Sequence, residues 1–309
     1  MTDFLKELTN FLAADVRTAV PLLLAATGLI FSERSGIVNI GAEGMMLIGA
    51  LAGVAGSYFL GHAWMGVLVA ALVGVLLGLL FGFLVVTARA SQIVIGAAFN
   101  LLGLGLTTSL ARVIFGVNTS PPPIDAFKPV AVPGLSRIPV LGEVIFHQTQ
   151  LTYLALVLVP VTYFILFKTT LGLKVRAVGE YPRAADTVGI NVYRIRYGAS
   201  MVCGMFCGLA GAYLSLSLLN FFTENMTAGK GFIALATVIF GKWNPFGVLG
   251  AALVFGAGEA LQYRLQAAGA NVPYQLLLMI PYLLTIAALA GFVGRAVPPA
   301  SSGRPYVKE

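Results

Sequence analysis

Residues 44–88 read GMMLIGALAGVAGSYFLGHAWMGVLVAALVGVLLGLLFGFLVVTA, without a single Asp, Glu, Lys or Arg. Four more windows lack these charges, at residues 90–111, 144–167, 197–223 and 265–294. Each window is long enough for at least one helix of about 20 residues, the length that crosses the hydrocarbon core of a bilayer. Their polarity does not alternate as it does in membrane barrels. The chain is therefore predicted to be an all-α, polytopic transmembrane helical bundle.

The composition supports a membrane protein. Of the 309 residues, 58% are hydrophobic and 10% are charged, whereas a soluble domain carries about a quarter of charged residues. We attribute the net charge of +7 to basic cytoplasmic loops rather than to nucleic-acid binding. The two cysteines, Cys203 and Cys207, lie one helical turn apart in an apolar run. They are interpreted as residues of a helix–helix contact, with no disulfide framework and no metal site.

About nine spans (eight to ten) are predicted in one transmembrane domain over residues 1–309. Residues 1–16 are expected to form an amphipathic helix that lies in the membrane interface. The seventh span is short, ends at the sequence GKWNPFG, and is expected to be broken or partial. The spans are expected at residues 18–32, 40–60, 64–87, 93–115, 150–167, 197–219, 230–242, 246–264 and 273–294.

The distribution of basic residues predicts the orientation. Cytoplasmic segments of membrane proteins are enriched in Lys and Arg. Placing the loop 168–196 in the cytoplasm puts 12 of the 19 basic residues there. The loop 116–149 then lies outside. With nine spans, the N-terminus lies outside as well. The 12 residues are Arg34, Arg89, Lys168, Lys174, Arg176, Arg183, Arg194, Arg196, Lys242, Arg295, Arg304 and Lys308.

Glycines at four-residue spacing predict close contacts between helices, because small residues let transmembrane backbones approach each other. These ridges comprise Gly74, Gly78 and Gly82; Gly49 and Gly53; and Gly204 and Gly208.

The motifs of common enzymes are missing from the sequence. There is no G-x-x-x-x-G-K-[ST] loop for ATP, no H-E-x-x-H zinc motif and no G-x-S-x-G elbow. The sequence therefore predicts a protein that is not an enzyme, with no cofactor and no catalytic residue of its own.

Polar residues within the spans mark possible functional positions, because they are costly in lipid. The segment SERSGIVNIGAEGMML, residues 32–47, holds Asn39 and Glu43 at helical spacing, and its glycines indicate an irregular backbone. Two interpretations of this pair stay open: a polar network that starts a helix, or the lining of a pathway. Asn100 either bonds to another helix or faces a substrate, and Phe99 beside it would suit a base by stacking.

Two further polar residues in or near the spans receive an interpretation from their sequence neighbours. Glu259 lies five residues before Arg264, which makes that arginine its plausible partner. Lys230, between two glycines, is placed at the outer membrane edge, either as an interfacial anchor or as a rim contact for an incoming partner protein.

The loop LGLKVRAVGEYPRAADTVGINVYRIR, residues 171–196, lies between two apolar runs. Pro182 suits the first position of a helix and Gly189 suits the position after its end. Ala184 and Ala185 give the intervening helix a small-residue face. The pattern predicts one or two short helices along the membrane, of a shape that docks in a groove of another protein.

Three segments resemble one family. RAVGEYPRAADTVGINVYRIR is similar to the cytoplasmic coupling loop of permease subunits of ATP-binding-cassette (ABC) importers. SERSGIVNIGAEGMMLIGA and TAGKGFIALATVIFGKWNPFG resemble signatures of the ribose-type family of simple-sugar and nucleoside permeases, and SGIVNIGAEGMM points to the nucleoside branch. The resemblance covers residues 18–294. One departure is the extra N-terminal span of ribose-type permeases, for which no counterpart is expected here because the amphipathic residues 1–16 stand in its place.

The resemblance implies a mechanism and partners. This chain and a longer paralogous permease would form the path for a nucleoside, in a bacterial cytoplasmic (inner) membrane. A cytoplasmic double-cassette ATPase would bind and hydrolyse ATP, and an extracytoplasmic binding protein or lipoprotein would deliver the substrate. A simple sugar remains an alternative substrate. A secondary transporter, with Glu43 and Glu259 as its only candidate carboxylates, or a passive channel remains an alternative mechanism.

The resemblance also implies roles for single residues. The ATPase-coupling residues would be Arg176, Glu180, Arg183, Ala184, Ala185 and Gly189. Independently of the resemblance, the polar and aromatic residues singled out above, Asn39, Glu43, Phe99 and Asn100, are the candidates for the substrate pathway.

Overall fold

The computed structural model describes residues 3–116, 124–268, 273–280, 283, 286 and 296–308. Seven helices within these residues are long and apolar enough to cross a membrane. They are α1 (Asp3–Arg34), α2 (Ala42–Leu60), α3 (Ala63–Gly82), α4 (Gln92–Phe115), α6 (Gln150–Lys168), α9 (Val192–Tyr213) and α11 (Pro245–Ala267). π-Helical turns over Phe83–Thr87 and Leu214–Leu218 extend α3 and α9.

The remaining elements are short. They are α5 (Leu141–Ile145), α7 (Thr170–Glu180), α8 (Pro182–Thr187), α10 (Lys230–Phe240), α12 (Tyr274–Leu278), a 3₁₀ turn at Leu135–Arg137, and the antiparallel pair β1 (Val130–Ala131) and β2 (His147–Gln148). The predicted all-α bundle is confirmed. The seventh predicted span corresponds to α10, whose 11 residues cover about 16 Å, half of the hydrocarbon core. Most of the ninth predicted span after α12 lies outside the described residues. Arg295 lies outside them too.

The N-terminal region differs from the prediction. Residues 1–16 and 18–32 were expected to be two helices, but residues 3–34 form the single helix α1. The predicted boundary between the two helices falls at Asp15 and Arg17, yet both residues have contacts in the bundle. The Arg17 guanidinium donates to Gln148 at 3.1 Å, and Asp15 lies in the contact between α1 and α11, beside Gly256. Contacts from distant segments thus allow α1 to continue through these polar residues.

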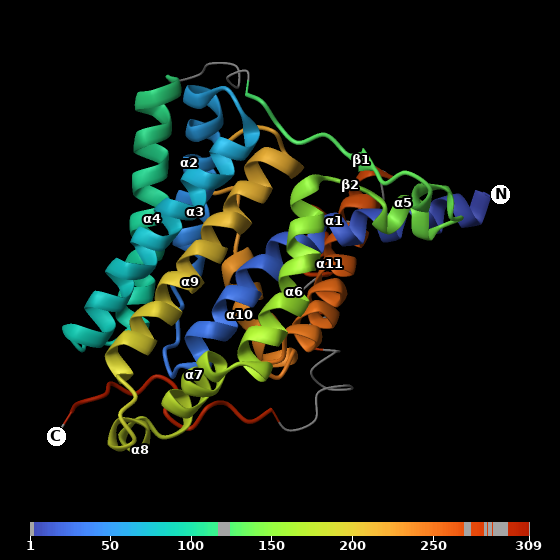
Figure 1. Cartoon of the computed structure of the whole chain (residues 1–309). Helices are drawn as coiled ribbons and strands as arrows, with labels where there is room; N and C mark the ends of the chain where they lie inside the picture. Colours follow the sequence, from blue (N-terminus) through green and yellow to red (C-terminus); the bar gives the residue numbers. More distant parts are fainter. Residues whose placement is uncertain are drawn as a thin grey trace.

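Helix α1 crosses the bundle obliquely (Figure 1). On one side it packs against α9, which itself contacts α2 and α3, while α4 packs on α2. On the other side α1 contacts α6, α10 and α11. Its N-terminal half lies beside α5 and the β-hairpin, and its C-terminal end lies beside α7. The beginning of the chain and the described part of loop 116–149 are therefore at the same end of the molecule, as predicted.

Glycines form the closest helix contacts. A Cβ at Gly74 or Gly204 would collide with the backbone of the facing helix, because these two residues join α3 to α9. A Cβ at Gly49 of α2 would collide with the Gly208 backbone of α9, and a Cβ at Gly208 would collide with the Ala70 carbonyl of α3. The predicted glycine ridges are thus confirmed as helix–helix contacts.

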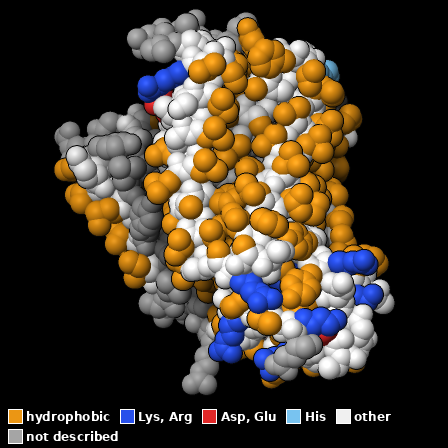
Figure 2. All heavy atoms as spheres, turned by 90° about the vertical axis from the view of Figure 1, so that its left-hand side faces the viewer, with side chains coloured by type: hydrophobic (Ala, Val, Ile, Leu, Met, Phe, Trp, Pro, Cys, Tyr) orange, Lys and Arg blue, Asp and Glu red, His pale blue; other side chains and the backbone are white. Residues whose placement is uncertain are grey.

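The outer surface is suited to a bilayer. Figure 2 shows a largely apolar face, with Lys and Arg side chains gathered below it. Helix α4 contributes to the apolar surface with Leu101 and Val113, which are 73% and 80% exposed. Such a surface is stable in hydrocarbon, and a basic end is typical of the cytoplasmic side of membrane proteins.

Candidate functional site

The predicted coupling loop forms two helices. Thr169 caps α7 by accepting a hydrogen bond from the Gly172 N–H at 3.2 Å. Pro182 is the first residue of α8. After α8, Gly189 adopts φ +85° and its N–H donates to the Asp186 carbonyl at 2.9 Å, as expected for a glycine that ends a helix. The loop is shorter than predicted, because α9 already begins at Val192 and includes Arg194 and Arg196.

The predicted coupling residues divide into two groups. Arg183, Ala184 and Gly189 are exposed. The other three contact this chain itself. Ala185 is buried beside Val178.

The remaining two coupling residues, Arg176 and Glu180, also contact other residues of this chain. The Arg176 guanidinium lies 5.1 Å from the centroid of the Phe167 ring. The Glu180 carboxylate accepts a hydrogen bond from the Ala300 N–H at 3.1 Å.

Sequence reasoning missed two exposed side chains on these helices. Tyr181 and Val188 are 71% and 75% exposed, next to Pro182 and Gly189. Large apolar groups in such positions add to an interaction surface. Their position could have indicated this exposure. Tyr181 and Val188 flank α8, where packing within the helix does not require a large apolar side chain.

Helix α7 ends against α1. A Cβ at Gly179 would collide with the Arg34 carbonyl oxygen, so the two backbones meet at a glycine. The Arg34 side chain donates to the Trp243 carbonyl oxygen from Nη2 at 3.2 Å. The Trp243 indole N–H donates in turn to Glu33. The end of α1 therefore joins α7 to the turn between α10 and α11.

A second polar centre lies at the N-terminus of α10, inside the bundle. The segment from Gly36 to Gly41 turns back into the bundle before α2 begins (Figure 1). Glu43 in the first turn of α2 then reaches α10. Its two carboxylate oxygens accept hydrogen bonds from the Gly229 N–H at 2.8 Å and the Gly231 N–H at 2.6 Å. A carboxylate at this position satisfies free N–H groups and complements the helix dipole.

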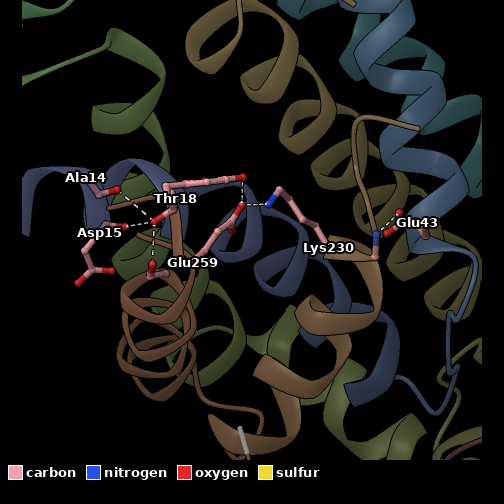
Figure 3. A network of polar contacts seen from close by, with 9 residues as sticks. Ala14, Asp15, Thr18, Glu43, Lys230 and Glu259 are labelled. Atoms are coloured by element: carbon pink, nitrogen blue, oxygen red, sulfur yellow. Dashed lines mark hydrogen bonds and ion pairs between the residues drawn. The ribbon is translucent and has the colours of Figure 1, made fainter. Parts of the chain in front are cut away.

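Lys230 extends from the start of α10 toward Glu259 in α11 (Figure 3). The two form an ion pair with side chains that are 10% and 11% exposed. The Tyr263 hydroxyl also donates to Glu259 at 2.7 Å. The expected partnership of Glu259 with Arg264 was wrong, and so was the placement of Lys230 at the edge. Pairing with a residue 29 positions away could not be read from local spacing.

Asn39 and Asn100 both bond to the irregular segment before α2. The Asn39 side-chain oxygen accepts from the Gly41 N–H at 3.0 Å. Asn100 accepts from the Gly44 N–H at 2.9 Å and donates to the Ile40 carbonyl at 3.1 Å. These hydrogen bonds hold the backbone at the start of α2, and a role of these residues in lining a pathway stays a prediction.

Phe99 is 3% exposed. Its ring centroid lies 5.5 Å from that of Phe81, edge to face. The structure thus brings all four predicted pathway residues to the region between α2, α4 and α10. The Asn39 oxygen, Glu43 and Asn100 bind backbone groups, whereas the Asn39 side-chain nitrogen donates to the sulfur atoms of Met45 and Cys203.

The site is suited to transport. A half-length helix that begins inside a membrane bundle is a feature of transporter binding sites. In the same chain, two short helices with an exposed face lie at the basic end.

Comparison with known proteins gives a consistent result. The family model described as "Branched-chain amino acid transport system / permease component" matches residues 12–289. The chain is 43% identical to the guanosine ABC transporter permease protein NupQ of Bacillus subtilis, over 99% of each chain. No solved structure gives a significant match.

Two further relatives carry different substrates in their names. The nucleoside ABC transporter permease protein NupC of Lactococcus lactis is 39% identical over 94% of each chain. TsgC13 of Haloferax volcanii, provisionally named a glucose ABC transporter permease protein, is 39% identical over 91% of each chain. The chain therefore belongs to this family of transport-system permease components, as a multi-pass permease subunit of an ABC importer.

Proposed function

We propose that this chain carries nucleosides across a bacterial cytoplasmic membrane. In the proposed assembly it pairs with a paralogous permease, receives substrate from an extracytoplasmic binding protein or lipoprotein, and is driven by ATP hydrolysis on a separate double-cassette ATPase. The observation that carries the proposal is the exposed face of α7 and α8, which is held against the ends of the spans. The nucleoside substrate is supported by the names of NupQ and NupC.

The coupling residues act in two ways in this proposal. Arg183, Ala184 and Gly189, with Tyr181 and Val188, touch the ATPase. Arg176, Glu180 and Ala185 are positioning residues, which hold α7 and α8 against the bundle. A movement of the ATPase is then passed through Gly179 to α1.

The substrate would pass near the N-terminus of α10. A neutral, polar nucleoside requires amide and hydroxyl groups and aromatic surfaces rather than a charged path. The Lys230–Glu259 pair and the Glu43 cap neutralise the charges at this helix end, which supports a neutral substrate. Asn39, Glu43, Phe99 and Asn100 would fix the position of α10 beside the path, and Asn100 would contact substrate in another conformation.

A simple sugar is the second candidate, and the name of TsgC13 favours it. Uptake of labelled guanosine into cells that express the whole transporter separates the two substrates. We expect excess unlabelled nucleosides to abolish the uptake and excess glucose to leave it unchanged. Uptake of labelled glucose without uptake of labelled guanosine would assign a sugar instead.

The assembly is tested by gentle purification of the tagged chain from its own membrane, followed by mass spectrometry. We expect a double-cassette ATPase and a second permease. Recovery of this chain alone, also after crosslinking, would favour a secondary transporter or a channel.

A further inference from the structure

The C-terminal segment, residues 300–307, lies against α7 and α8, the proposed coupling helices. The Gly179 carbonyl at the end of α7 accepts hydrogen bonds from the Ser301 N–H at 2.9 Å and from the Ser301 hydroxyl at 2.6 Å. Two residues later, the Gly303 N–H donates to the Gly36 carbonyl at 3.0 Å. The segment therefore bridges the end of α7 and the turn that follows α1.

Arg196 of α9 provides a second attachment. It is 2% exposed, although its charge suggested a cytoplasmic loop. Its Nε donates to the Ser35 carbonyl at 3.2 Å and its Nη1 to the Arg304 carbonyl at 3.1 Å. One guanidinium thus joins α9, the turn after α1 and the C-terminal segment, and the backbone carbonyls that receive the N–H groups of Nε and Nη1 offset part of the cost of its burial.

Tyr306 provides a third attachment. It is 6% exposed and completes a small apolar cluster with Val178, Ala185 and Val192. Its ring centroid lies 5.5 Å from that of Tyr193. The cluster takes residues from α7, α8 and α9, so the C-terminal segment contacts all three helices.

A groove of about 570 Å³ runs between the coupling helices and this segment. One wall contains Tyr181, Arg183 and Ala184, and the other contains Arg304 and Val307. Tyr181 and Val307 are 71% and 43% exposed. The acidic member of the lining, Glu180, accepts the Ala300 N–H, so the groove combines apolar surface with a basic balance.

We propose that residues 300–307 form the second wall of the ATPase docking surface, and that the groove receives an acidic, partly apolar segment of the ATPase. The inference rests on the proposed function, and charge complementarity assigns the partner's chemistry. Because the segment is bound to the ends of α1 and α9 as well as to α7 and α8, a displacement in the groove reaches two spans directly.

Truncation tests the attachment within the otherwise complete transporter. A variant lacking residues 300–309 loses every contact described above. The matched control lacks only residues 308–309, and so loses the exposed Lys308–Asp186 pair at 3.5 Å. We expect the longer deletion to abolish uptake and recovery of the ATPase while the chain stays in the membrane. We expect the control to retain both.

Charge reversal tests the groove without disturbing the attachments, because only the backbone carbonyl of Arg304 binds Arg196. We expect Arg304→Glu to weaken ATPase binding at least about tenfold, and Arg304→Lys to retain binding within about threefold. Thermal unfolding of both variants should equal that of the wild type. A crosslinker on Val307→Cys should also reach the ATPase, and the buried Cys203 and Cys207 should not react with it.

The outcomes separate this inference from the proposed function. If the wild-type chain recovers no ATPase, the proposed function fails. If it recovers the ATPase, and the long deletion and Arg304→Glu recover it equally with normal uptake, the second wall is wrong while the importer stands.

Discussion

Glu43 shows how one side chain holds a half-length helix in the membrane. Two charge-assisted hydrogen bonds join its carboxylate to the first N–H groups of α10. Glu43→Ala leaves these buried donors without a partner, and Glu43→Gln retains one acceptor. We expect the free energy of unfolding to fall by about 2–5 kcal/mol for Ala and by less for Gln. Thermal unfolding in detergent checks this order, with the exposed Glu7→Ala as control. Wild-type stability of Glu43→Ala would refute the cap.

The Lys230–Glu259 pair leads to a second prediction for single residues. Removing one member of a buried pair leaves the other charge without compensation, which costs about 3–5 kcal/mol, whereas replacing both is often neutral. We expect Lys230→Met to be strongly destabilised, and the double variant Lys230→Met with Glu259→Gln to recover most of the loss. The amide oxygen introduced by Glu259→Gln can still accept from the Tyr263 hydroxyl, as the carboxylate does. A double variant no more stable than Lys230→Met would show that the pair is not coupled in this way.

At the scale of elements, α7 depends on its contact with α1 at Gly179. Gly179→Ala adds a methyl group where the Arg34 carbonyl already lies, so α7 must move. We expect the variant to reach the membrane but to lose ATPase recovery and uptake. The control is Gly105→Ala in α4, where a Cβ meets nothing within 4 Å; it should transport normally and gain up to about 1 kcal/mol of helix stability. Normal uptake by Gly179→Ala would mean that this contact does not transmit the movement.

The sequence predicted elements well where a local pattern determines them. Long charge-free windows locate the spans because lipid admits few charges, and Pro182 and Gly189 bound α8 because each fits one helix end. The prediction failed where a residue distant in the sequence determines the structure of an element. Asp15 and Arg17 lie at the predicted boundary between two helices, but their contacts with α11 and Gln148 place both of them within α1.

The same limit applied to the functional site. Asn39, Glu43 and Asn100 were singled out by their polarity within spans, but no spacing in the sequence shows that Glu43 meets Gly229 and Gly231. No local pattern predicted the position of the C-terminal residues 300–307. Their backbone contacts with α7 involve groups that every residue carries, and so they leave no mark in the sequence.

For the whole molecule, α1 connects two opposite ends, and this determines which residues share a side of the membrane. The Arg17–Gln148 contact ties the N-terminal half of α1 to the β-hairpin, and the Arg34–Gly179 contact ties its other end to the coupling helices. With the basic end in the cytoplasm, the N-terminus and the hairpin face outward. The two native cysteines are buried, so single introduced cysteines report the side of the membrane without background.

We expect Glu7→Cys and Val130→Cys to react with a membrane-impermeant maleimide in right-side-out vesicles. Val188→Cys, at a position that is 75% exposed, should react only in inside-out vesicles, and added ATPase should protect it. Labelling of Glu7→Cys and Val188→Cys from the same side would contradict the path of α1 through the membrane. Labelling of all three from the sides opposite to those expected would keep the fold but reverse its orientation, and the coupling helices would then be out of reach of any cytoplasmic ATPase.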